Sequence, residues 1–279
     1  MTWRIISDSA CDLKIADVEN EKVGFATIPF VFTIGDKNYV DDEDLEPSVM
    51  LDELESTSGS SYSGCPSPEA WESEFEKADN CFAITISSNL SGCYNSARLG
   101  MENTLANHPQ KNIYVLDSLA TGPECAMCIF ALKKWIEEGL EFSDIVTKAE
   151  ALLTETHTAF ALCSFDNLVK SGRMNKLVGF VAKTLGMWGV GVASDQGTIL
   201  IKGKARGHAK AINIIIDYME ECNFNGGEVI MSHCYNQEIA QKLKEAILAK
   251  WENASVTLLE TRGLDSYYAE RKGIIIGFR

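Results

Sequence analysis

Short apolar runs alternate with longer amphipathic stretches through the first half of this 279-residue chain. The run NCFAITIS at 80–87 is followed by a helical pattern at 92–108, by the run NIYVLDS at 112–118 and by a second helical pattern at 124–139. Strands that alternate with helices in this way pair in parallel through right-handed crossovers. The order of these segments therefore predicts an α/β domain built on a parallel sheet.

Three polar loops follow predicted strands in this half of the chain. They are SDSACD at 7–12, SSNLSG at 87–92 and DSLATG at 117–122. Ligands of open parallel sheets bind at the carboxyl ends of the strands. We therefore expect a binding site where these loops meet.

The pattern changes in character near residue 155. We predict strands over HTAFALCS, EVIMSHC, SVTLLE and GIIIGF, helices over 165–186, 209–221 and 237–251, and a hairpin that turns at Asp195, Gln196 and Gly197. This half has α+β character with a mixed sheet. The expected domains are residues 1–155 and 156–279.

Composition limits the partners that the chain can have. The formal net charge is -15, whereas non-specific binding to nucleic acid or to anionic membranes needs clustered Lys and Arg. No apolar stretch reaches the roughly 18 residues that a membrane helix needs, and the N-terminus lacks the pattern of an export signal. We therefore expect a cytoplasmic protein that binds no nucleic acid, does not insert stably into membranes and keeps its nine cysteines reduced.

The stretch TISSNLSGCYNSA at 85–97 places four serines at a strand-to-helix turn. A helix that begins through Ser91 and Gly92 offers free backbone N–H groups at the positive end of its dipole, beside serine hydroxyls. Such a helix start can bind one anionic oxygen group. The same residues also suit a plain cap, in which Ser91 accepts a hydrogen bond from a helix N–H. Both interpretations stay open at this point.

Catalytic motifs that could use these serines are absent from the sequence. The chain has no G-x-S-x-G nucleophile elbow, no G-x-x-x-x-G-K-[ST] phosphate loop and no G-x-G-x-x-G. Its four histidines form no recognisable triad, and only His233 is predicted at the carboxyl end of a strand. Cys125 and Cys128 lack a second ligand pair, so they are predicted to pack in the core. A hydrolase or transferase that uses a serine on an ester or phosphoester in the same cleft stays open as the alternative function.

Segments spread over nearly the whole chain resemble those of the DegV-like fatty-acid-binding proteins, in the same order. They are IISDSACDL at 5–13, SGCPSPEAW at 63–71, ISSNLSGCYNSA at 86–97, VLDS at 115–118, FDNLVKSGRMNK at 165–176 and KGKARGHAKAI at 202–212. The combination of SSNLSG with a downstream SGR is the most specific part of this resemblance.

The resemblance implies an α/β two-domain DegV-like fold, with an N-terminal parallel α/β domain, a C-terminal α+β domain and one long-chain fatty acid in a tunnel between them. The carboxylate is then expected near Ser91, the Gly92 N–H and the Ser63 hydroxyl, with Arg173 reaching it directly or through water. Similar bacterial proteins present the fatty acid to a separate ATP-dependent kinase, which makes acyl phosphate for phospholipid synthesis. The resemblance therefore implies a carrier and no enzyme, with no metal and no cofactor besides the bound fatty acid.

The chain departs from the family pattern at two parts of this expected site. Residues 63–67 read SGCPS, where family members commonly have Thr-Ser-Gln-Pro-Ser. Near the C-terminus, SYYAERKGIIIGF puts Tyr268 where the family has a His followed by Thr-Gly-Pro-Gly. Tyr268 can still donate a hydrogen bond, but it is neutral and larger than imidazole. The charged residues 270–272 that follow are predicted to form a solvated turn.

Two further stretches each have two possible roles. The basic cluster with Lys202, Lys204 and Arg206 is predicted either to dock on an acidic partner, such as a kinase subunit, or to be a solvated helix start. The apolar stretch at 178–192 is predicted either to line part of the acyl tunnel or to be ordinary core.

Overall fold

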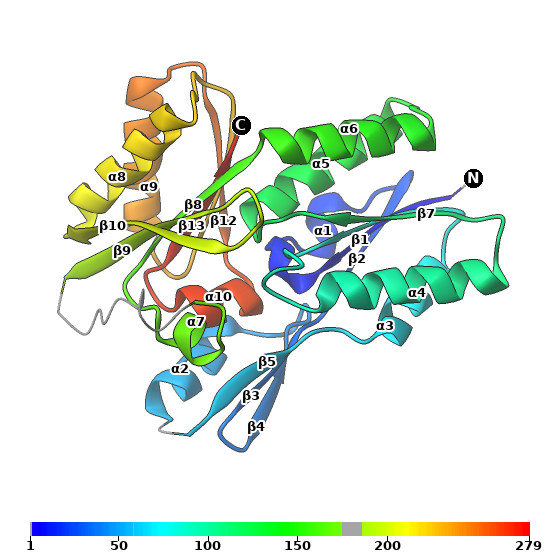
Figure 1. Cartoon of the computed structure of the whole chain (residues 1–279), viewed down its shortest axis with the longest axis horizontal. Coiled ribbons are helices and arrows are strands. Elements are labelled where there is room, and N and C mark those ends of the chain that lie inside the picture. The colour runs from blue at the N-terminus through cyan, green and yellow to red at the C-terminus, as the bar shows by residue number, and fades with distance from the viewer. Residues whose placement is uncertain (1, 58, 175–185) are drawn as a thin grey trace.

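The protein is organised around three sheets (Figure 1), in a computed structural model that describes residues 2–57, 59–174 and 186–279. The first sheet has the strand order β2-β1-β6-β7, and all of its pairs are parallel. Its strands are β1 (Trp3–Asp8), β2 (Val23–Ile28), β6 (Asn80–Thr85) and β7 (Asn112–Asp117). The central strand β6 is buried along its whole length, as expected when both faces of a parallel sheet are covered. The predicted parallel sheet is confirmed.

Helices cover both faces of this first sheet (Figure 1). The helical elements are the 3₁₀ turn η1 (Ser9–Cys11), α1 (Ile15–Val18), α3 (Pro68–Phe75), α4 (Cys93–Asn107), α5 (Pro123–Glu137) and α6 (Phe142–Glu155). Trp71 of α3 and Ala97 of α4 pack on one face, and Ile129 of α5 packs on the other. Cys125 and Cys128 of α5 are fully buried, which confirms their predicted place in the core, and all nine cysteines are free.

A small antiparallel sheet lies beside the first one, with the strand order β4-β3-β5. It consists of β3 (Val31–Ile34), β4 (Lys37–Val40) and β5 (Ser61–Gly64), with α2 (Pro47–Ser56) between β4 and β5 in the chain. Phe32 and Ile34 point into the core on one face of this sheet, whereas Val31 and Tyr62 are exposed on the other. The sequence did not predict β5 as a strand, so this small antiparallel sheet is a finding of the structure.

The C-terminal part forms the predicted mixed sheet, which has six strands in the order β10-β9-β8-β13-β11-β12. The β11–β12 pair is parallel and the other pairs are antiparallel. Its strands are β8 (His157–Leu162), β9 (Met187–Ala193), β10 (Ile199–Arg206), β11 (Glu228–His233), β12 (Ser255–Glu260) and β13 (Ile274–Phe278). The associated helices are α7 (Asp166–Lys170), α8 (His208–Glu221), α9 (Gln237–Lys250) and α10 (Gly263–Ala269). The predicted hairpin turn is confirmed by the bond from Gly197 N–H to the carbonyl of Ser194.

The long helix predicted over 165–186 is wrong in its described part. Helix α7 ends at Lys170, and Gly172 then takes a positive φ of 77°, which ends the helical run. Residues 175–185 lie outside the described residues, so the tunnel role predicted for 178–192 is untested there. The described remainder, 187–192, lies in β9, and Trp188 and Val190 pack in the C-terminal core.

Within the described ranges, none of the helices has the length and apolar character needed to cross a membrane.

Candidate functional site

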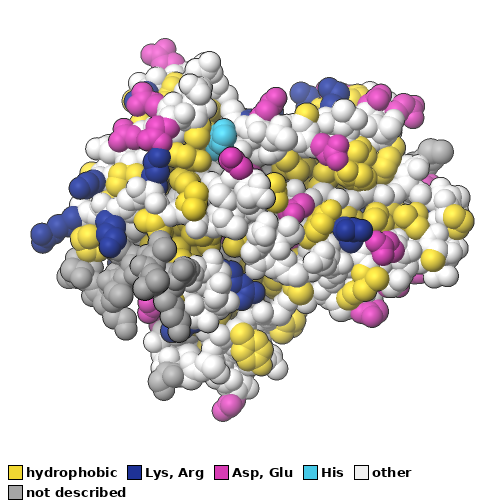
Figure 2. All heavy atoms as spheres, in the orientation of Figure 1, with side chains coloured by type: hydrophobic (Ala, Val, Ile, Leu, Met, Phe, Trp, Pro, Cys, Tyr) yellow, Lys and Arg dark blue, Asp and Glu magenta, His cyan; other side chains and the backbone are white. Residues whose placement is uncertain are grey.

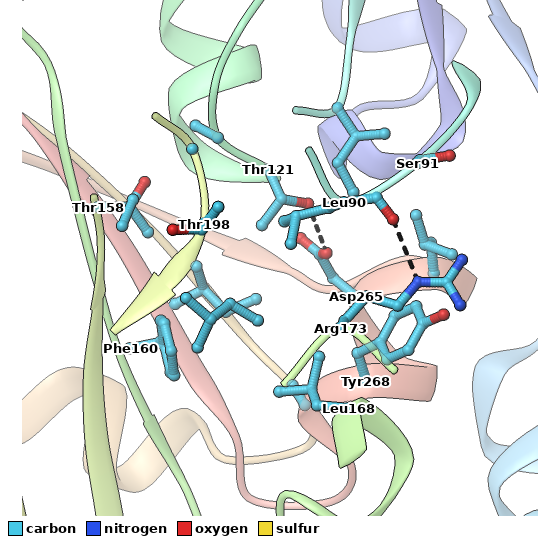
Figure 3. Close-up of a pocket in the computed structure, with 18 of the residues that line it drawn as sticks. Leu90, Ser91, Thr121, Thr158, Phe160, Leu168, Arg173, Thr198, Asp265 and Tyr268 are labelled. Atoms are coloured by element: carbon cyan, nitrogen blue, oxygen red, sulfur yellow. Dashed lines mark hydrogen bonds between the residues drawn. The ribbon is translucent and has the colours of Figure 1, made fainter. Parts of the chain in front are cut away.

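A mostly apolar pocket lies where the first sheet meets the C-terminal sheet (Figure 3). It has about 800 Å³ of space between atoms, part of it open to solvent. The apolar lining consists of Phe30, Ile86, Leu90, Leu119, Ala120, Phe160, Leu162, Leu168, Ala193, Ile199, Leu264, Ala269 and Ile275. The loops after β6 and β7 contribute to the lining, as expected for the carboxyl edge of a parallel sheet.

Four of the five predicted site residues line this pocket: Ser63, Ser91, Arg173 and Tyr268. The structure brings Ser63 on β5 and Tyr268 on α10 together, with 2.9 Å between their hydroxyl oxygens. Figure 3 shows the Arg173 guanidinium on the same side of the pocket as the hydroxyls of Ser91 and Tyr268. One end of an otherwise apolar pocket thus holds a positive charge and several hydroxyls.

Arg173 is held in place by two backbone carbonyls. Its Nε donates to the Leu90 carbonyl at 3.1 Å, and its Nη1 donates to the Ser171 carbonyl at 2.7 Å. The first bond joins the turn after α7 to the SSNLSG loop. Backbone contacts of this kind orient the guanidinium before any ligand arrives, which lowers the entropy cost of binding.

Ser91 caps helix α4 and also lines the pocket. The N–H of Cys93, the first residue of α4, donates to Ser91 Oγ at 3.2 Å, so the capping interpretation is confirmed. Gly92 occupies the N-cap position but is not among the residues that line the pocket. The anion-binding role predicted for the Gly92 N–H therefore stays a prediction.

The SSNLSG loop also forms hydrogen bonds to the tip of the β9–β10 hairpin. Ser87 Oγ donates to the Gly197 carbonyl at 2.8 Å, and Asn89 Nδ2 donates to the Gln196 carbonyl at 2.7 Å. Ser87 is fully buried by this contact. The sequence predicted that Ser87 lies in a candidate loop. It did not predict that Ser87 and Asn89 bind the hairpin, because nothing in the sequence identifies carbonyl partners more than 100 residues away.

Arg173 and Asp265 are the charged side chains among the described residues that line the pocket. Thr121 Oγ1 donates to Asp265 Oδ1 at 2.8 Å (Figure 3). Burial, followed by the nearby Asp12 carboxyl, raises the pKa of Asp265 well above its usual range. The raised pKa favours the uncharged form of Asp265 beside the apolar lining.

None of the described residues that line the pocket is a histidine, so the lining does not supply a Ser–His pair of the kind that activates a serine nucleophile. His233 ends β11 as predicted, but its Nδ1 accepts a long bond from the Asn236 N–H at 3.4 Å and it lines a different pocket. In the part of the chain that the structure describes, no group of three or more His, Cys, Asp or Glu residues is arranged to hold a metal ion. The arrangement suits binding of an amphipathic anion.

Two predictions about charged segments need correction. The basic cluster is not a helix start, because Lys202, Lys204 and Arg206 lie on strand β10 and the next helix begins at His208. Lys202 forms an ion pair with Glu221. Figure 2 shows Lys and Arg side chains gathered on the side of the molecule where β10 and α8 lie.

The predicted solvated turn at 270–272 is also wrong in part. Glu270 is partly buried and accepts a hydrogen bond from Ser164 Oγ at 2.8 Å. Arg271 forms ion pairs with α2, including a 2.9 Å contact between its Nε and Glu55 Oε1. These contacts fix the chain that leaves α10, the helix with Tyr268.

Comparison with known proteins identifies relatives along the whole chain. The model of a family described as an uncharacterised protein, DegV family, matches residues 2–268. A DegV domain-containing protein from Streptococcus gordonii is 36% identical over 278 residues, which cover 100% of this chain and 99% of that protein.

Solved structures agree with this assignment. The fatty acid kinase (Fak) B3 protein of Streptococcus pneumoniae, loaded with linoleic acid, has a TM-score of 0.97 and 36% identity, covering 100% of this chain and 99% of that chain. A DegV family protein from Eubacterium eligens, loaded with heptadecanoic acid, has a TM-score of 0.94 and 34% identity, covering 99% of each chain. The chain described here therefore belongs to the DegV family.

Proposed function

We propose that this protein binds one long-chain fatty acid in the pocket between its two large sheets. The carboxylate lies at the end formed by Ser63, Ser91, Arg173 and Tyr268, and the acyl chain runs along the apolar lining. The observation that carries the proposal is one positively charged, hydroxyl-rich end on an otherwise apolar pocket. The linoleic and heptadecanoic acids described in the S. pneumoniae and E. eligens relatives support it.

The acyl chain supplies most of the binding free energy. Burial of roughly 0.8 kcal/mol per CH₂ over about 15 methylenes gives on the order of 12 kcal/mol before the ordering costs of association. The carboxylate needs charge-assisted hydrogen bonds to offset its loss of water. Arg173 and the surrounding hydroxyls provide such donors without a large basic surface.

The first test is the lipid content of the purified protein. After expression in bacteria, solvent extraction and mass spectrometry are expected to recover about one long-chain fatty acid per protein, because burial of the chain makes dissociation slow. Added long-chain fatty acid is also expected to raise the melting temperature of delipidated protein. A lipid-free extract together with an unchanged melting temperature would contradict the proposal.

We further propose that the protein presents the bound carboxylate to a fatty acid kinase and is itself a carrier. The name of the S. pneumoniae relative, a Fak B3 protein, supports this role. The fatty acid is then a ligand and no separate cofactor is required. We also propose that the protein lies in the cytoplasm, where such a kinase finds ATP. The domain boundary is proposed between Glu155 and Thr156, which is supported by the start of β8 at His157.

Docking is assigned to the basic cluster of Lys202, Lys204 and Arg206 on β10. Arg206 is exposed and lies at the end of that edge strand. Arg206→Glu is expected to slow acyl phosphate formation by a purified fatty acid kinase roughly two- to fivefold, without changing fatty acid affinity. Lys134→Glu on α5 is the matched control, since Lys134 is also exposed and has only a 3.9 Å contact with Glu138. Equal rates for the two variants would exclude docking through Arg206.

A further inference from the structure

Two buried carboxyl groups face each other beside the proposed acyl pocket. Asp12 follows η1 and is 4% exposed, and Asp265 lies on α10 and is 3% exposed. One oxygen of each is already used: Asp12 Oδ1 accepts the Arg262 N–H at 2.7 Å, and Asp265 Oδ1 accepts the Thr121 hydroxyl at 2.8 Å. The other oxygen of each, Oδ2, is buried and accepts no hydrogen bond of normal geometry among the described residues, although the Ser232 hydroxyl lies close enough to Asp12 to lower its pKa.

These two free oxygens border the same small space at the start of α5. A Cβ placed on Gly122, the N-cap of α5, would lie 2.3 Å from Asp265 Oδ2 and 3.0 Å from Asp12 Oδ2. Two ionised carboxylates at such a place would repel each other in a low-dielectric environment. A single proton between them removes the repulsion and gives both free oxygens a partner. The positive end of the α5 dipole then favours the one remaining negative charge.

The surrounding charges do not replace this proton. Buried titratable and charged groups around the pair include Asp8, Asp41, Cys125, Cys234 and Arg262, and the cleft that Asp12 also lines adds Lys14, Glu43, His233 and Glu260. Arg262 is the buried cation among them, and its guanidinium donates elsewhere: to the Leu13 carbonyl, the Thr27 hydroxyl and the Asp41 carbonyl.

We propose that Asp12 and Asp265 share one proton, and that this bond positions α10, and with it Tyr268, against the N-terminal sheet. The pair consists of positioning residues, since Asp265 lines the pocket but lies away from the hydroxyl-rich end. The role in positioning Tyr268 rests on the proposed fatty acid binding. The shared proton itself does not, so the two can be tested separately.

A shared proton makes folding depend on pH in a defined direction. An unfolded Asp has a pKa of about 3.9, whereas burial raises the pKa of Asp12 to about 6 and that of Asp265 further. At neutral pH the folded pair therefore holds a proton that the unfolded chain has released. The stability that this proton contributes therefore falls as pH rises. The folding constant falls by up to tenfold per pH unit, which corresponds to about 1.4 kcal/mol.

The test is urea unfolding at pH 7.5 and 8.5 for the full chain without added ligand. Burial raises the pKa values of Asp8 and Glu124 to about 6 and about 7, so both are mostly ionised over this interval. Asp265→Asn keeps an oxygen for Thr121 and places an amide donor toward Asp12. We expect the folding constant of the wild type to fall up to tenfold more than that of Asp265→Asn. Asp12→Asn is the reciprocal variant and is expected to behave like Asp265→Asn.

Glu124→Gln is the matched control, because Glu124 is another buried carboxyl, held by the hydroxyls of Thr156 and Thr158. It is expected to keep the wild-type pH dependence over this interval. The buried thiols add the same pH dependence to every variant, so they cancel in the comparison. If both Asn variants keep the wild-type pH dependence, the pair shares no proton at pH 7.5 or above, contrary to the proposal.

Fatty acid binding tests the positioning role on the same proteins. With the fluorescent fatty acid cis-parinaric acid as probe, Asp265→Leu is expected to weaken binding about two- to tenfold, because the bond to Asp12 is lost. Asp265→Asn, which keeps that bond, is expected to restore it. Equal affinities for the Leu variant and the wild type would overturn the positioning role. Absence of probe binding to the wild type would instead count against the proposed function and leave the unfolding result standing.

Discussion

Replacement of Arg262 by methionine is expected to lower the free energy of unfolding by about 3–5 kcal/mol, because it leaves the buried Asp41 carboxyl without its cation. The Arg262 side chain is only 6% exposed. Its Nη1 donates to the Leu13 carbonyl at 2.7 Å and to Thr27 Oγ1 at 3.0 Å, and its Nη2 donates to the Asp41 carbonyl at 3.0 Å. Methionine fills similar space but satisfies none of these acceptors. Urea unfolding at pH 7 measures the loss.

The Arg262 contacts join the chain just before α10 to the N-terminal sheet and to the loop after β4. Asp41 completes this junction, since its carboxyl oxygens each accept a backbone N–H at 2.8 Å, from Gly263 and Leu264. Loss of the cation therefore affects the start of α10 as well as the charge balance. We expect Arg262→Met to weaken fatty acid binding too, through the displaced Tyr268.

Arg271→Met is the matched control for this prediction. Arg271 lies at the other end of α10, is 30% exposed and forms ion pairs with Glu55 and Asp52 on α2. Exposed pairs contribute about 0–1 kcal/mol, because water and salt screen them. A loss below 1 kcal/mol for both variants would show that Arg262 is not needed to balance the buried Asp41 carboxyl.

The parallel sheet could be predicted from sequence because its signals are local. NCFAITIS and NIYVLDS are apolar runs of strand length, and the helices between and after them have long periodic patterns. The structure places α4 at Cys93–Asn107 and α5 at Pro123–Glu137, within a few residues of the predicted bounds. In these segments local preference and burial favour the same structure.

Helix α10 could not be predicted because its signals are not local. It has only seven residues, Gly263–Ala269, and no side chain of its own sequence caps it. Its first N–H groups are satisfied by Asp41, more than 200 residues away in the chain. The family resemblance therefore placed Tyr268 in a candidate site, but no local signal predicted the helix that presents it. The carboxyl pair of Asp12 and Asp265 was missed for the same reason.

The SSNLSG loop illustrates which features a local sequence pattern can predict and which features depend on the fold. Its three serines after an apolar strand suggested either an anion site or a helix cap, and the structure gives Ser91 a hydrogen bond from the first N–H of α4 together with a place in the pocket wall. Ser87 and Asn89 hold the C-terminal hairpin, and the Leu90 carbonyl holds Arg173. The loop thus joins the two large sheets next to the pocket. Only the fold brings these partners together.

Arg173 is the side chain whose loss should affect fatty acid binding most. Arg173→Ala is expected to raise the Kd for cis-parinaric acid by roughly 30- to 1,000-fold, about 2–4 kcal/mol, since the buried carboxylate loses its charged partner. Tyr268→Phe removes only a neutral hydroxyl, which lies 2.9 Å from Ser63 Oγ. A loss of about two- to tenfold is expected for that variant. Fluorescence titration at pH 7.5 measures both.

The backbone contacts of Arg173 require a further variant, because Arg173→Ala also breaks the 3.1 Å bond to the Leu90 carbonyl. Arg173→Gln removes the charge but retains an amide donor for that region, and circular dichroism establishes that each variant is folded. Arg98→Ala is the control, because Arg98 is exposed and its ion-pair partner among the described residues is Glu102 on the same helix. If Gln binds as weakly as Ala, the charge of Arg173 holds the carboxylate. Wild-type affinity in both variants would move the carboxylate away from Arg173 and leave the acyl pocket without its proposed polar end.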